Sequence, residues 1–330
     1  MIYADQRWIG SHGIGRFARN VLPAIRYSPI SLGGNPAAPL DTWRLSRALK
    51  TLTRDDLFFS PGYNAPFFCP SPFIFTIHDL SHIYCAENSS PLIWLYYATV
   101  AKSACHRAAA VLTVSEFTRS QILEWSGIPP AKVINVRCGV EASYRPDGET
   151  YGFHFPYLLC VSNRKPHKNE SRLVMAFARA KVSGMHFVFT GEPSPGIMRR
   201  IEKERVKDRV HFIGSVPETE LPALYRGAEA LIFPSLYEGF GLPVLEAMAC
   251  GTPVVTANAT AMPEVAADAA LLVDPTSVEQ IVHAIERIVS DEPLRLCLRR
   301  KGLERAAQFS WDQTRDRVKK VISSSTAERC

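Results

Sequence analysis

The chain has 330 residues, of which 46% are hydrophobic and 21% are charged. Both fractions are ordinary for a globular protein, and the length exceeds that of one typical domain, so about two domains are expected that fold without disulfide staples. The net charge of +6 suits an anionic ligand or a membrane surface, but no basic stripe is interleaved with aromatic residues, which argues against nucleic acid as a partner.

We expect neither a secretion signal nor a membrane span from this sequence. The first residues lack the apolar core of a signal peptide, and the longest apolar run, at 91–101, is shorter than the roughly 20 residues that cross a bilayer. The cysteines form no C-x-x-C pair and no metal-ligand spacing. We therefore expect a soluble or peripheral protein in a reducing compartment, whose buried free thiols are the eight cysteines Cys69, Cys85, Cys105, Cys138, Cys160, Cys250, Cys297 and Cys330.

Apolar, strand-like runs alternate with helical patterns along the chain, which favours an α/β fold with parallel sheets. In the first half, strands are expected at 73–77, 109–114 and 133–136, and helices at 17–25 and 91–106. The aromatic and proline-rich segment 58–75 is interpreted as a loop whose rings lie mainly in the core. Contact of these rings with a lipid acceptor or a bilayer, together with Leu92, Trp94 and Tyr96, is the alternative.

The proline and glycine content of residues 141–155 predicts a linker, after which the pattern restarts. We expect two doubly wound domains joined near residue 150, with the ligand in the cleft between them, because ligands of such sheets bind beyond the carboxyl ends of the strands. The strands expected in the second half are 157–161, 186–190, 210–214, 230–233, 253–256 and 270–273, and the helices are 170–181, 196–206, 218–227, 278–289 and one from Trp311.

Gly13 and Gly15 stand in the run G-I-G-R-F-A, which follows an apolar start and opens the first helix. The run matches G-x-G-x-x-A, the dinucleotide fingerprint, and so raises a nicotinamide-dependent dehydrogenase as a rival function. That fingerprint requires an acidic residue about 20 positions further on, and residues 18–40 contain no Asp or Glu. A dehydrogenase is therefore disfavoured, and a tight strand-to-helix turn is the plain structural alternative.

His78 and Asp79 follow the strand expected at 73–77. A histidine at the end of an apolar strand can orient hydroxyls or carry a proton near neutral pH, although a single histidine is more often structural. Asp79 either fixes a neighbouring group or caps the next turn at Ser81. Ser115 is expected to cap the helix that follows it, which is a structural role.

Three cations, Arg164, Lys165 and Lys168, lie between the first strand and the first helix of the second half. Fixed cations at the carboxyl end of a strand suit a diphosphate, because they stabilise the charge that builds up on a departing nucleoside diphosphate. A solvated basic loop is the alternative.

A glycine-rich turn with two carboxylates eight positions apart, Glu238 and Glu246, follows an apolar strand. Gly239 and Gly241 remove side chains from the turn, so that backbone N–H groups can face a ligand. Pro243 suits a first helical turn, and such a helix N-terminus binds phosphate. Glu246 is expected in that first turn, where it accepts hydrogen bonds from two hydroxyls. A turn with a capping glutamate is the plain alternative.

Residues 238–255, E-G-F-G-L-P-x-L-E-A-M-A-x-G-x-P-V-V, resemble the donor-site motif of the large retaining glycosyltransferase family with a GT-B fold, glycosyl transferases group 1. G-I-G-R-F, T-I-H-D-L and N-R-K-P-H-K-N are further matches in chain order. The resemblance covers nearly the whole chain and implies two Rossmann-like domains facing across a cleft. Residues 1–150 would form the acceptor side and 151–310 the donor domain, with 311–330 as a helix packed back on the first domain.

The resemblance implies a metal-independent hexosyltransferase that retains anomeric configuration, and the absence of a D-x-D motif agrees with this. The motifs are most similar to those of bacterial mannosyltransferases of surface polysaccharide assembly. GDP-mannose is therefore the first expected donor and UDP-glucose the next, with no other cofactor. The acceptor would be a glycan or a lipid-linked sugar in lipopolysaccharide or glycolipid biosynthesis, and the protein would be cytoplasmic or peripheral on the inner membrane.

The resemblance also assigns site residues. His78 and Glu238 are the expected catalytic residues, and the backbone near Val216 would receive the nucleobase. In many members a Gly-Arg pair and an arginine stand where this chain has Ser162 and His167, so the assignment of Lys168 is firmer than that of Arg164. The expected donor-binding residues are Gly13, Gly15, Arg164, Lys168, Val216, Glu238, Gly239, Phe240, Gly241, Leu242 and Glu246.

Two mechanisms and two rival functions stay open. In a front-face route the leaving phosphate takes the acceptor proton, whereas a double displacement uses Glu238 as the nucleophile. We favour the first, because the resemblance makes Glu238 a ligand of sugar hydroxyls. The rivals are another enzyme on the same architecture, such as a nucleotide-sugar epimerase or a phosphorylase, and a non-catalytic protein that binds sugar nucleotides.

Overall fold

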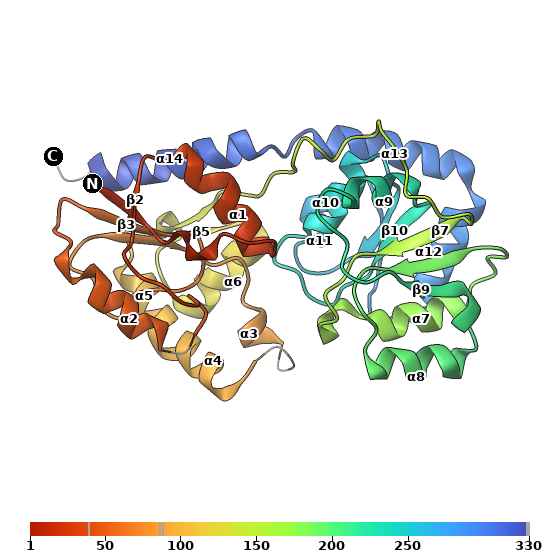
Figure 1. The fold of residues 1–330 in the computed structure, drawn as a ribbon, viewed down its shortest axis with the longest axis horizontal. Coiled ribbons are helices and arrows are strands. Elements are labelled where there is room, and N and C mark those ends of the chain that lie inside the picture. The colour runs from red at the N-terminus through yellow and green to blue at the C-terminus, as the bar shows by residue number, and fades with distance from the viewer. Residues whose placement is uncertain (39, 86, 88, 328–330) are drawn as a thin grey trace. The chain divides into compact units, whose positions relative to one another are not determined.

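The computed structural model describes residues 1–38, 40–85, 87 and 89–327. The chain divides into two compact units (Figure 1). The first comprises residues 1–139 and the carboxyl-terminal segment from Ser310, and the second is Val140–Phe309. The division thus falls at residues 139 and 140, whereas the sequence predicted a domain boundary near 150.

The segment 141–155 contains no helix or strand, as expected of a linker, but it is attached to the second unit. Its backbone is held by the second unit, because the Tyr151 N–H donates to the Ala223 carbonyl over 3.0 Å and Arg226 Nε donates to the Glu149 carbonyl over 2.8 Å. The ring of Tyr144 also contacts that of Tyr225.

The first unit contains a six-stranded parallel sheet in the order β2-β1-β3-β4-β5-β6. Every residue of the three strands β3 to β5 is buried, as expected for a sheet covered on both faces. The strands are β1 (Ile2–Ala4), β2 (Ser28–Pro29), β3 (Leu57–Ser60), β4 (Phe73–Thr76), β5 (Ala110–Thr113) and β6 (Val133–Asn135).

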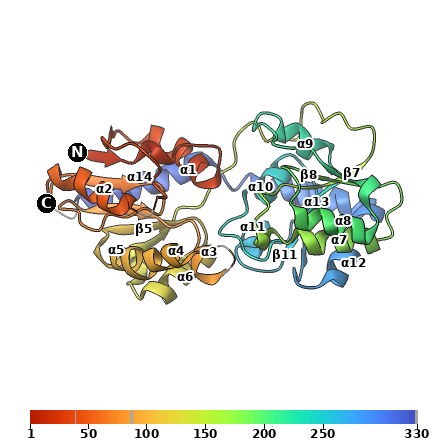
Figure 2. The same ribbon diagram turned by 60° about the horizontal axis from the view of Figure 1, so that its bottom comes forward.

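Helices cover both faces of this sheet (Figures 1 and 2). One hydrophobic cluster joins the strands to α2, α5 and α6, and α1 contacts the carboxyl-terminal helix α14. The helix expected at 91–106 is present but contains a π-helix, Tyr96–Ala101, between α4 and α5. The helices are α1 (Gly13–Val21), α2 (Asp41–Ala48), α3 (Ser81–Tyr84), α4 (Pro91–Leu95), α5 (Lys102–Arg107), α6 (Glu116–Ser126) and α14 (Trp311–Ala327).

The second unit contains another six-stranded parallel sheet, in the order β12-β11-β10-β7-β8-β9. Chain connectivity reverses between β7 and β10, the kind of switch point at which ligands bind in doubly wound folds. The strands are β7 (Tyr157–Cys160), β8 (His186–Phe189), β9 (Val210–Phe212), β10 (Ala230–Phe233), β11 (Val254–Ala257) and β12 (Leu271–Val273).

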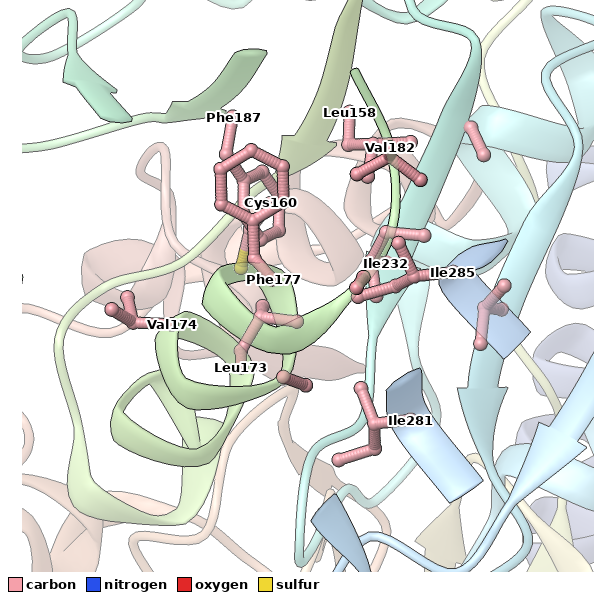
Figure 3. Close-up of a cluster of buried hydrophobic side chains, with 14 of the residues drawn as sticks. Leu158, Cys160, Leu173, Val174, Phe177, Val182, Phe187, Ile232, Ile281 and Ile285 are labelled. Carbon is pink, nitrogen blue, oxygen red and sulfur yellow. The ribbon is translucent and has the colours of Figure 1, made fainter. Parts of the chain in front are cut away.

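The core of the second unit lies where α7 and α12 pack on the sheet (Figure 3). Phe177 of α7 contacts Phe187 of β8, and Ile281 and Ile285 of α12 are fully buried in the same cluster. The helices are α7 (Glu170–Arg179), α8 (Pro195–Glu204), α9 (Leu221–Gly227), α10 (Leu242–Ala249), α11 (Met262–Ala266), α12 (Val278–Ser290) and α13 (Glu292–Ala306).

Most strands and helices expected from the sequence are confirmed to within a few residues. The exception is 58–75, which was interpreted as a loop although β3 begins at Leu57 and both Phe58 and Phe59 are buried in it. The aromatic rings of this segment are not all in the core: Phe73 is buried, whereas Phe67 and Phe68 are exposed.

The seven cysteines that the structure describes are free thiols. The expected burial is confirmed for Cys105, Cys138, Cys160 and Cys250. Burial raises the pKa of the Cys105 and Cys250 thiols to about 12. The expectation is wrong for the exposed Cys297, and Cys69 and Cys85 are half-buried; Cys330 lies outside the described residues. Among the described residues, no helix combines the length and the apolar character that a bilayer crossing requires.

Candidate functional site

Two residues that the sequence singled out meet in the second unit. The short 3₁₀ helix Pro166–Lys168 follows β7 and directs the Lys168 side chain to the turn after β10, where its Nζ lies 2.6 Å from Glu238 Oε1. Each side chain is 12% exposed, and Lys168 Nζ also lies 5.0 Å from the centroid of the Phe233 ring. A mostly buried ion pair therefore stands at the carboxyl ends of two adjacent strands.

Asn169 fixes the loop that carries Lys168. Its Nδ2 donates to the carbonyls of Pro234, over 2.9 Å, and Pro275, over 2.6 Å, so one side chain ties together the segments that follow β7, β10 and β12. Its backbone is left-handed, with φ of 62°, where α7 begins. No role was predicted for Asn169. Its position between Lys168 and α7 was the one indication in the sequence, because asparagine tolerates a left-handed conformation where a helix begins.

Thr260 supports Glu238 from the loop after β11. Its Oγ1 accepts a hydrogen bond from the Glu238 N–H over 3.2 Å, while the Glu238 carbonyl accepts one from the Ala261 N–H over 3.4 Å. Thr260 has a φ of 57°, an uncommon conformation for a β-branched residue. This strained position holds the backbone of Glu238 in place, and nothing in the sequence pattern pointed to it.

The Arg164 side chain turns toward the end of β8. Its guanidinium pairs with Glu170, donates to the carbonyls of residues 190–192, and lies 5.6 and 5.0 Å from the ring centroids of Phe189 and Phe212. Its charge is therefore compensated within the protein, whereas the neighbouring Lys165 is exposed. The structure thus brings Lys168 and Glu238 together and places Arg164 in a separate cluster.

The glycine-rich turn ends at Gly241, which has a φ of 105° and immediately precedes α10. A Cβ at this position would lie 2.3 Å from Cε of Met262, the movable end of a side chain, so it is the positive φ that requires glycine here. Pro243 lies in the first turn of α10, as expected, and no side chain caps this helix. Pro243 has no N–H, and the N–H groups of Val244 and Leu245 donate to the Gly241 carbonyl over 3.0 and 3.4 Å, which leaves the N–H of Leu242 for an anion at this helix terminus.

Glu246 does not lie in the first turn of α10, because the helix already begins at Leu242. Its side chain is buried, with 2% of its surface exposed, and its Oε2 accepts a hydrogen bond from the Tyr225 hydroxyl over 2.8 Å. Tyr225 belongs to α9 and was not among the expected site residues. The carboxylate is thus fixed in orientation from inside the unit.

Val216 lies in the turn after β9. The N–H of Gly191 bonds to the carbonyl of Gly214, so this turn is tied to the end of β8, next to the carbonyls that hold Arg164. A separate cavity of about 490 Å³ opens beside the ends of β11 and β12, and Leu236, Asn258, Asp274, Thr276 and Gln280 are among its lining residues. None of the expected donor-binding residues lines it.

In the first unit, His78 lies just after β4, and its Nε2 is 2.9 Å from the carbonyl oxygen of Pro61. Since a carbonyl only accepts, His78 Nε2 carries the proton and Nδ1 is left as an acceptor. Burial lowers the pKa of His78 below its usual value, which favours this neutral form. The ring also meets Phe17 of α1 edge to face, with 5.0 Å between the centroids.

Gly13 and Gly15 have different surroundings at the start of α1. A Cβ at Gly15 would lie 2.5 Å from the carbonyl oxygen of Gly10, whereas a Cβ at Gly13 would meet no atom within 4 Å. His12 caps the helix, because its Nδ1 accepts a hydrogen bond from the Gly15 N–H over 3.0 Å. His12 was not anticipated, since histidine is not among the usual N-cap residues.

A buried ionic network holds the segment that leads to this turn. Arg7 bonds to Asp5 and Asp41 with both branches of its guanidinium, at 2.7 to 2.9 Å, and Asn64 donates to both carboxylates. Burial acts to lower the pKa of Arg7, but the two carboxylates outweigh it and raise the pKa above the usual value. Trp8 Nε1 donates to Asn64 Oδ1 over 2.6 Å, which fixes the turn to the end of β3.

The chain matches two family models, "Glycosyltransferase Family 4" over residues 7–144 and "Glycosyl transferases group 1" over residues 154–305. It is 30% identical over 274 residues to the O-antigen chain mannosyltransferase B of Escherichia coli, a match that covers 78% of this chain and 72% of that protein. It is 32% identical over 249 residues to the MMP alpha-(1->4)-mannosyltransferase of Mycolicibacterium hassiacum, covering 72% and 60%. By contrast, it spans only 28% of the serotype-specific mannosyltransferase WbdA of Escherichia coli.

Solved structures resemble the whole chain. The sucrose-phosphate synthase of Thermosynechococcus elongatus superimposes with a TM-score of 0.78 at 20% identity and covers 99% of both chains. Anabaena HepE in complex with UDP-glucose gives a TM-score of 0.79 at 17% identity, covering 98% of this chain and 99% of that one. At these identities the likeness establishes the fold alone.

Proposed function

Because this chain belongs to the glycosyl transferases group 1 family, we propose that it transfers mannose from GDP-mannose to an acceptor hydroxyl with retention of configuration. That it is a glycosyltransferase with a GT-B fold follows from the family membership and from its two parallel six-stranded sheets. The family and the fold expected from the sequence are therefore confirmed. The donor, the acceptor and the roles of individual residues are proposals.

The ion pair between Lys168 and Glu238 is the observation that carries the proposed donor site. The ammonium of Lys168 has three N–H donors, of which Glu238 takes one, so the others are available to diphosphate oxygens. The N–H of Leu242, at the N-terminus of α10, offers a further donor at the end of the same glycine-rich turn. Glu238 and the backbone from Gly239 to Leu242, including Phe240, then hold the hydroxyls of the sugar and the diphosphate next to it.

The remaining roles follow the sequence expectations. Glu246, oriented by the Tyr225 hydroxyl, accepts hydrogen bonds from the ribose hydroxyls in this proposal. The backbone near Val216 receives the nucleobase, and Arg164 shapes that region by holding the end of β8. In the first unit, Nδ1 of the neutral His78 accepts a hydrogen bond from a hydroxyl of the acceptor or the sugar. Gly13 leaves the start of α1 open to a ligand, whereas Gly15 is required by the close approach of the Gly10 backbone.

The arrangement favours the front-face mechanism. As the glycosidic bond breaks, negative charge develops on the leaving diphosphate, and Lys168 with the α10 N-terminus stabilises it. The leaving phosphate oxygen then takes the proton of the acceptor hydroxyl on the same face. Glu238 is poorly suited to attack as a nucleophile, because its carboxylate is already engaged by the ammonium at 2.6 Å. A glycosyl–Glu238 ester trapped with a slow donor would establish double displacement instead.

Mannose is proposed because two relatives that match more than two thirds of this chain are named as mannosyltransferases, one of them for O-antigen chains. The acceptor is proposed to be a glycan or lipid-linked sugar of a surface polysaccharide or glycolipid. HepE, crystallised with UDP-glucose, shares the fold at 17% identity, so UDP-glucose is the second donor to test.

A thermal-shift screen against GDP-mannose, UDP-glucose and dTDP sugars tests the donor. A ligand at about 100 times its Kd stabilises the folded state by about 2.7 kcal/mol, so the true donor raises Tm distinctly more than the others. Lys168→Ala should abolish this rise, and Lys165→Ala, an exposed cation of the same loop, should leave it intact. Equal effects of both variants would remove Lys168 from the donor site.

The same protein distinguishes the rival functions. A transferase releases GDP from GDP-mannose slowly in water and faster with acceptor, while an epimerase returns a nucleotide sugar of altered configuration. Donor binding with no product of either kind would identify a non-catalytic protein that binds sugar nucleotides.

A further inference from the structure

The first unit carries a concentration of exposed apolar side chains. Of the eleven large hydrophobic residues exposed among the described residues, only Leu296 belongs to the second unit. Six others come from the start of α2, the loop after β3 and α4, and we call them the apolar patch: Trp43, Phe67, Phe68, Leu92, Trp94 and Leu95, each between 50% and 63% exposed. A soluble protein seldom leaves so many large apolar groups together in water without a partner for them.

Contacts hold the three segments that carry the apolar patch together. The rings of Trp43 and Phe67 stack, with 4.9 Å between their centroids. Ser46 Oγ of α2 accepts hydrogen bonds from the N–H groups of both Phe67 and Phe68, over 2.8 and 3.1 Å. The loop after β3 is therefore clamped onto α2 with its rings directed outward.

The π-helix links the same loop to α4. The Tyr96 hydroxyl donates to the Tyr63 carbonyl over 2.7 Å and accepts from the Ala65 N–H over 3.0 Å. Leu92 and Thr42 line one small cavity, so α4 and α2 meet there. Both helices cover the same face of the sheet, opposite α1 and α14 (Figure 1).

Exposed cations lie on the same helix as Trp43 of the apolar patch. Trp43, Arg47 and Lys50 recur at spacings of four and three residues, which places them on one stripe of α2 and the turn that follows, and Arg44 adjoins it. All three cations are exposed. Residues 42–54, 57–78 and 89–115, which carry the whole patch, contain no Asp or Glu.

We propose that this face binds the surface of an anionic bilayer, with the apolar patch at the level of the headgroups and Arg44, Arg47 and Lys50 on lipid phosphates. Tryptophan and leucine side chains flanked by Arg and Lys suit an anionic interface, because the apolar groups leave water while the cations meet fixed negative charge. A second protein copy fits less well, since a symmetric contact would bring these cations against one another. Membrane binding does not depend on the identity of the sugar donor.

Vesicle binding by the full chain tests the proposal. The protein should co-sediment with vesicles of phosphatidylglycerol and phosphatidylethanolamine, but not with phosphatidylcholine alone, and salt should weaken the binding. Trp43→Gln/Leu92→Gln/Trp94→Gln should weaken it by on the order of tenfold or more. Arg44→Gln/Arg47→Gln/Lys50→Gln should weaken it by about fivefold for each cation removed.

Matched controls come from the second unit. Leu296→Gln removes an exposed apolar group elsewhere, and Arg199→Gln/Lys203→Gln/Lys207→Gln removes three exposed cations around α8. Both should bind vesicles like the unaltered protein. Tryptophan emission adds a direct readout, because a brominated lipid should quench Trp43 and Trp94 but not the buried Trp8 and Trp311.

Three results would overturn the proposal. One is no binding of the unaltered protein to anionic vesicles. Another is equal binding by the patch variants and the second-unit controls. The third is that the patch variants turn an oligomer into a monomer in analytical ultracentrifugation while vesicle binding is unchanged, which would assign the face to contacts between copies. Thermal melts of each variant establish that it is folded, and the exposure of all altered side chains predicts little change in Tm.

Discussion

The ammonium of Lys168 lies 2.6 Å from the carboxylate of Glu238, although seventy positions separate the two residues in the chain. Two consequences follow from this pairing. The buried carboxylate has a compensating charge before any ligand binds, and the lysine is held where a diphosphate could share it. The ion pair is thus expected to contribute both to stability and to donor binding.

A double-mutant cycle on Lys168→Met and Glu238→Gln separates these contributions. Removing one partner leaves the other mostly buried without its countercharge, so each single variant should lose about 1–3 kcal/mol of unfolding free energy. The double variant should lose less than the sum. Urea denaturation measures the coupling, and nucleotide titration should show that Lys168→Met binds GDP more weakly than Glu238→Gln does. Additive losses of stability would mean that the two charges do not interact.

β10, an unbroken apolar run, and α12, with a clear helical period, are among the elements that the sequence predicted well. β1 and β2 have three and two residues, too few for any periodicity, and they become visible only through their pairing. β3 was misinterpreted because prolines and aromatic residues follow it at once. The segment 141–155 has the composition of a linker, yet contacts with α9 order it, and composition cannot reveal such contacts.

The sequence motif predicted the side chains expected to face the ligand, but not the side chains that hold them in position. Asn169 bonds to carbonyls 65 and 106 positions away, and Tyr225 reaches a carboxylate 21 positions further along the chain. These residues come together only when the sheet has formed. A local sequence pattern therefore cannot predict the hydrogen bonds between them. Glu246 was placed in a first turn because its distance from Pro243 is short, whereas α10 starts before that proline.

Gly15→Ala should destabilise the protein, and Gly13→Ala should not. The added Cβ at Gly15 would lie 2.5 Å from the backbone of Gly10, which cannot move without disturbing the turn, whereas at Gly13 it meets open space within the helix. We expect a loss of about 1–3 kcal/mol for Gly15→Ala and a change near zero or a slight gain for Gly13→Ala. Chemical denaturation of both variants measures the difference, and similar values would contradict the steric role assigned to Gly15.

Tyr225→Phe tests whether the orientation of Glu246 matters for the nucleotide. Loss of the hydroxyl leaves Glu246 Oε2 without this buried hydrogen bond, at a cost of about 1–3 kcal/mol in stability. If Glu246 holds the ribose, the Kd for GDP should also rise, since the carboxylate loses a fixed position. Calorimetry with GDP and with inorganic pyrophosphate separates the two, because pyrophosphate lacks a ribose and its binding should not change. An equal loss for both ligands would place the effect elsewhere.

Because of His12 and His78, the free energy of unfolding is expected to fall in mild acid. Burial is the main cause that lowers the pKa of each below the usual 6.5, so the unfolded chain binds protons more readily than the folded one. The stability that their neutral forms contribute is therefore complete above about pH 6.5 and declines as the pH falls toward the lowered folded-state pKa. For His12 the reason is local, because protonation of Nδ1 ends its hydrogen bond from Gly15.

His12→Asn keeps a capping side chain without a titrating group, so its Tm should fall less than that of the unaltered protein between about pH 7.5 and about pH 5. His283→Asn, at an exposed position of α12, should reproduce the unaltered curve, and a flattened curve for this control instead would assign the acid sensitivity to surface histidines.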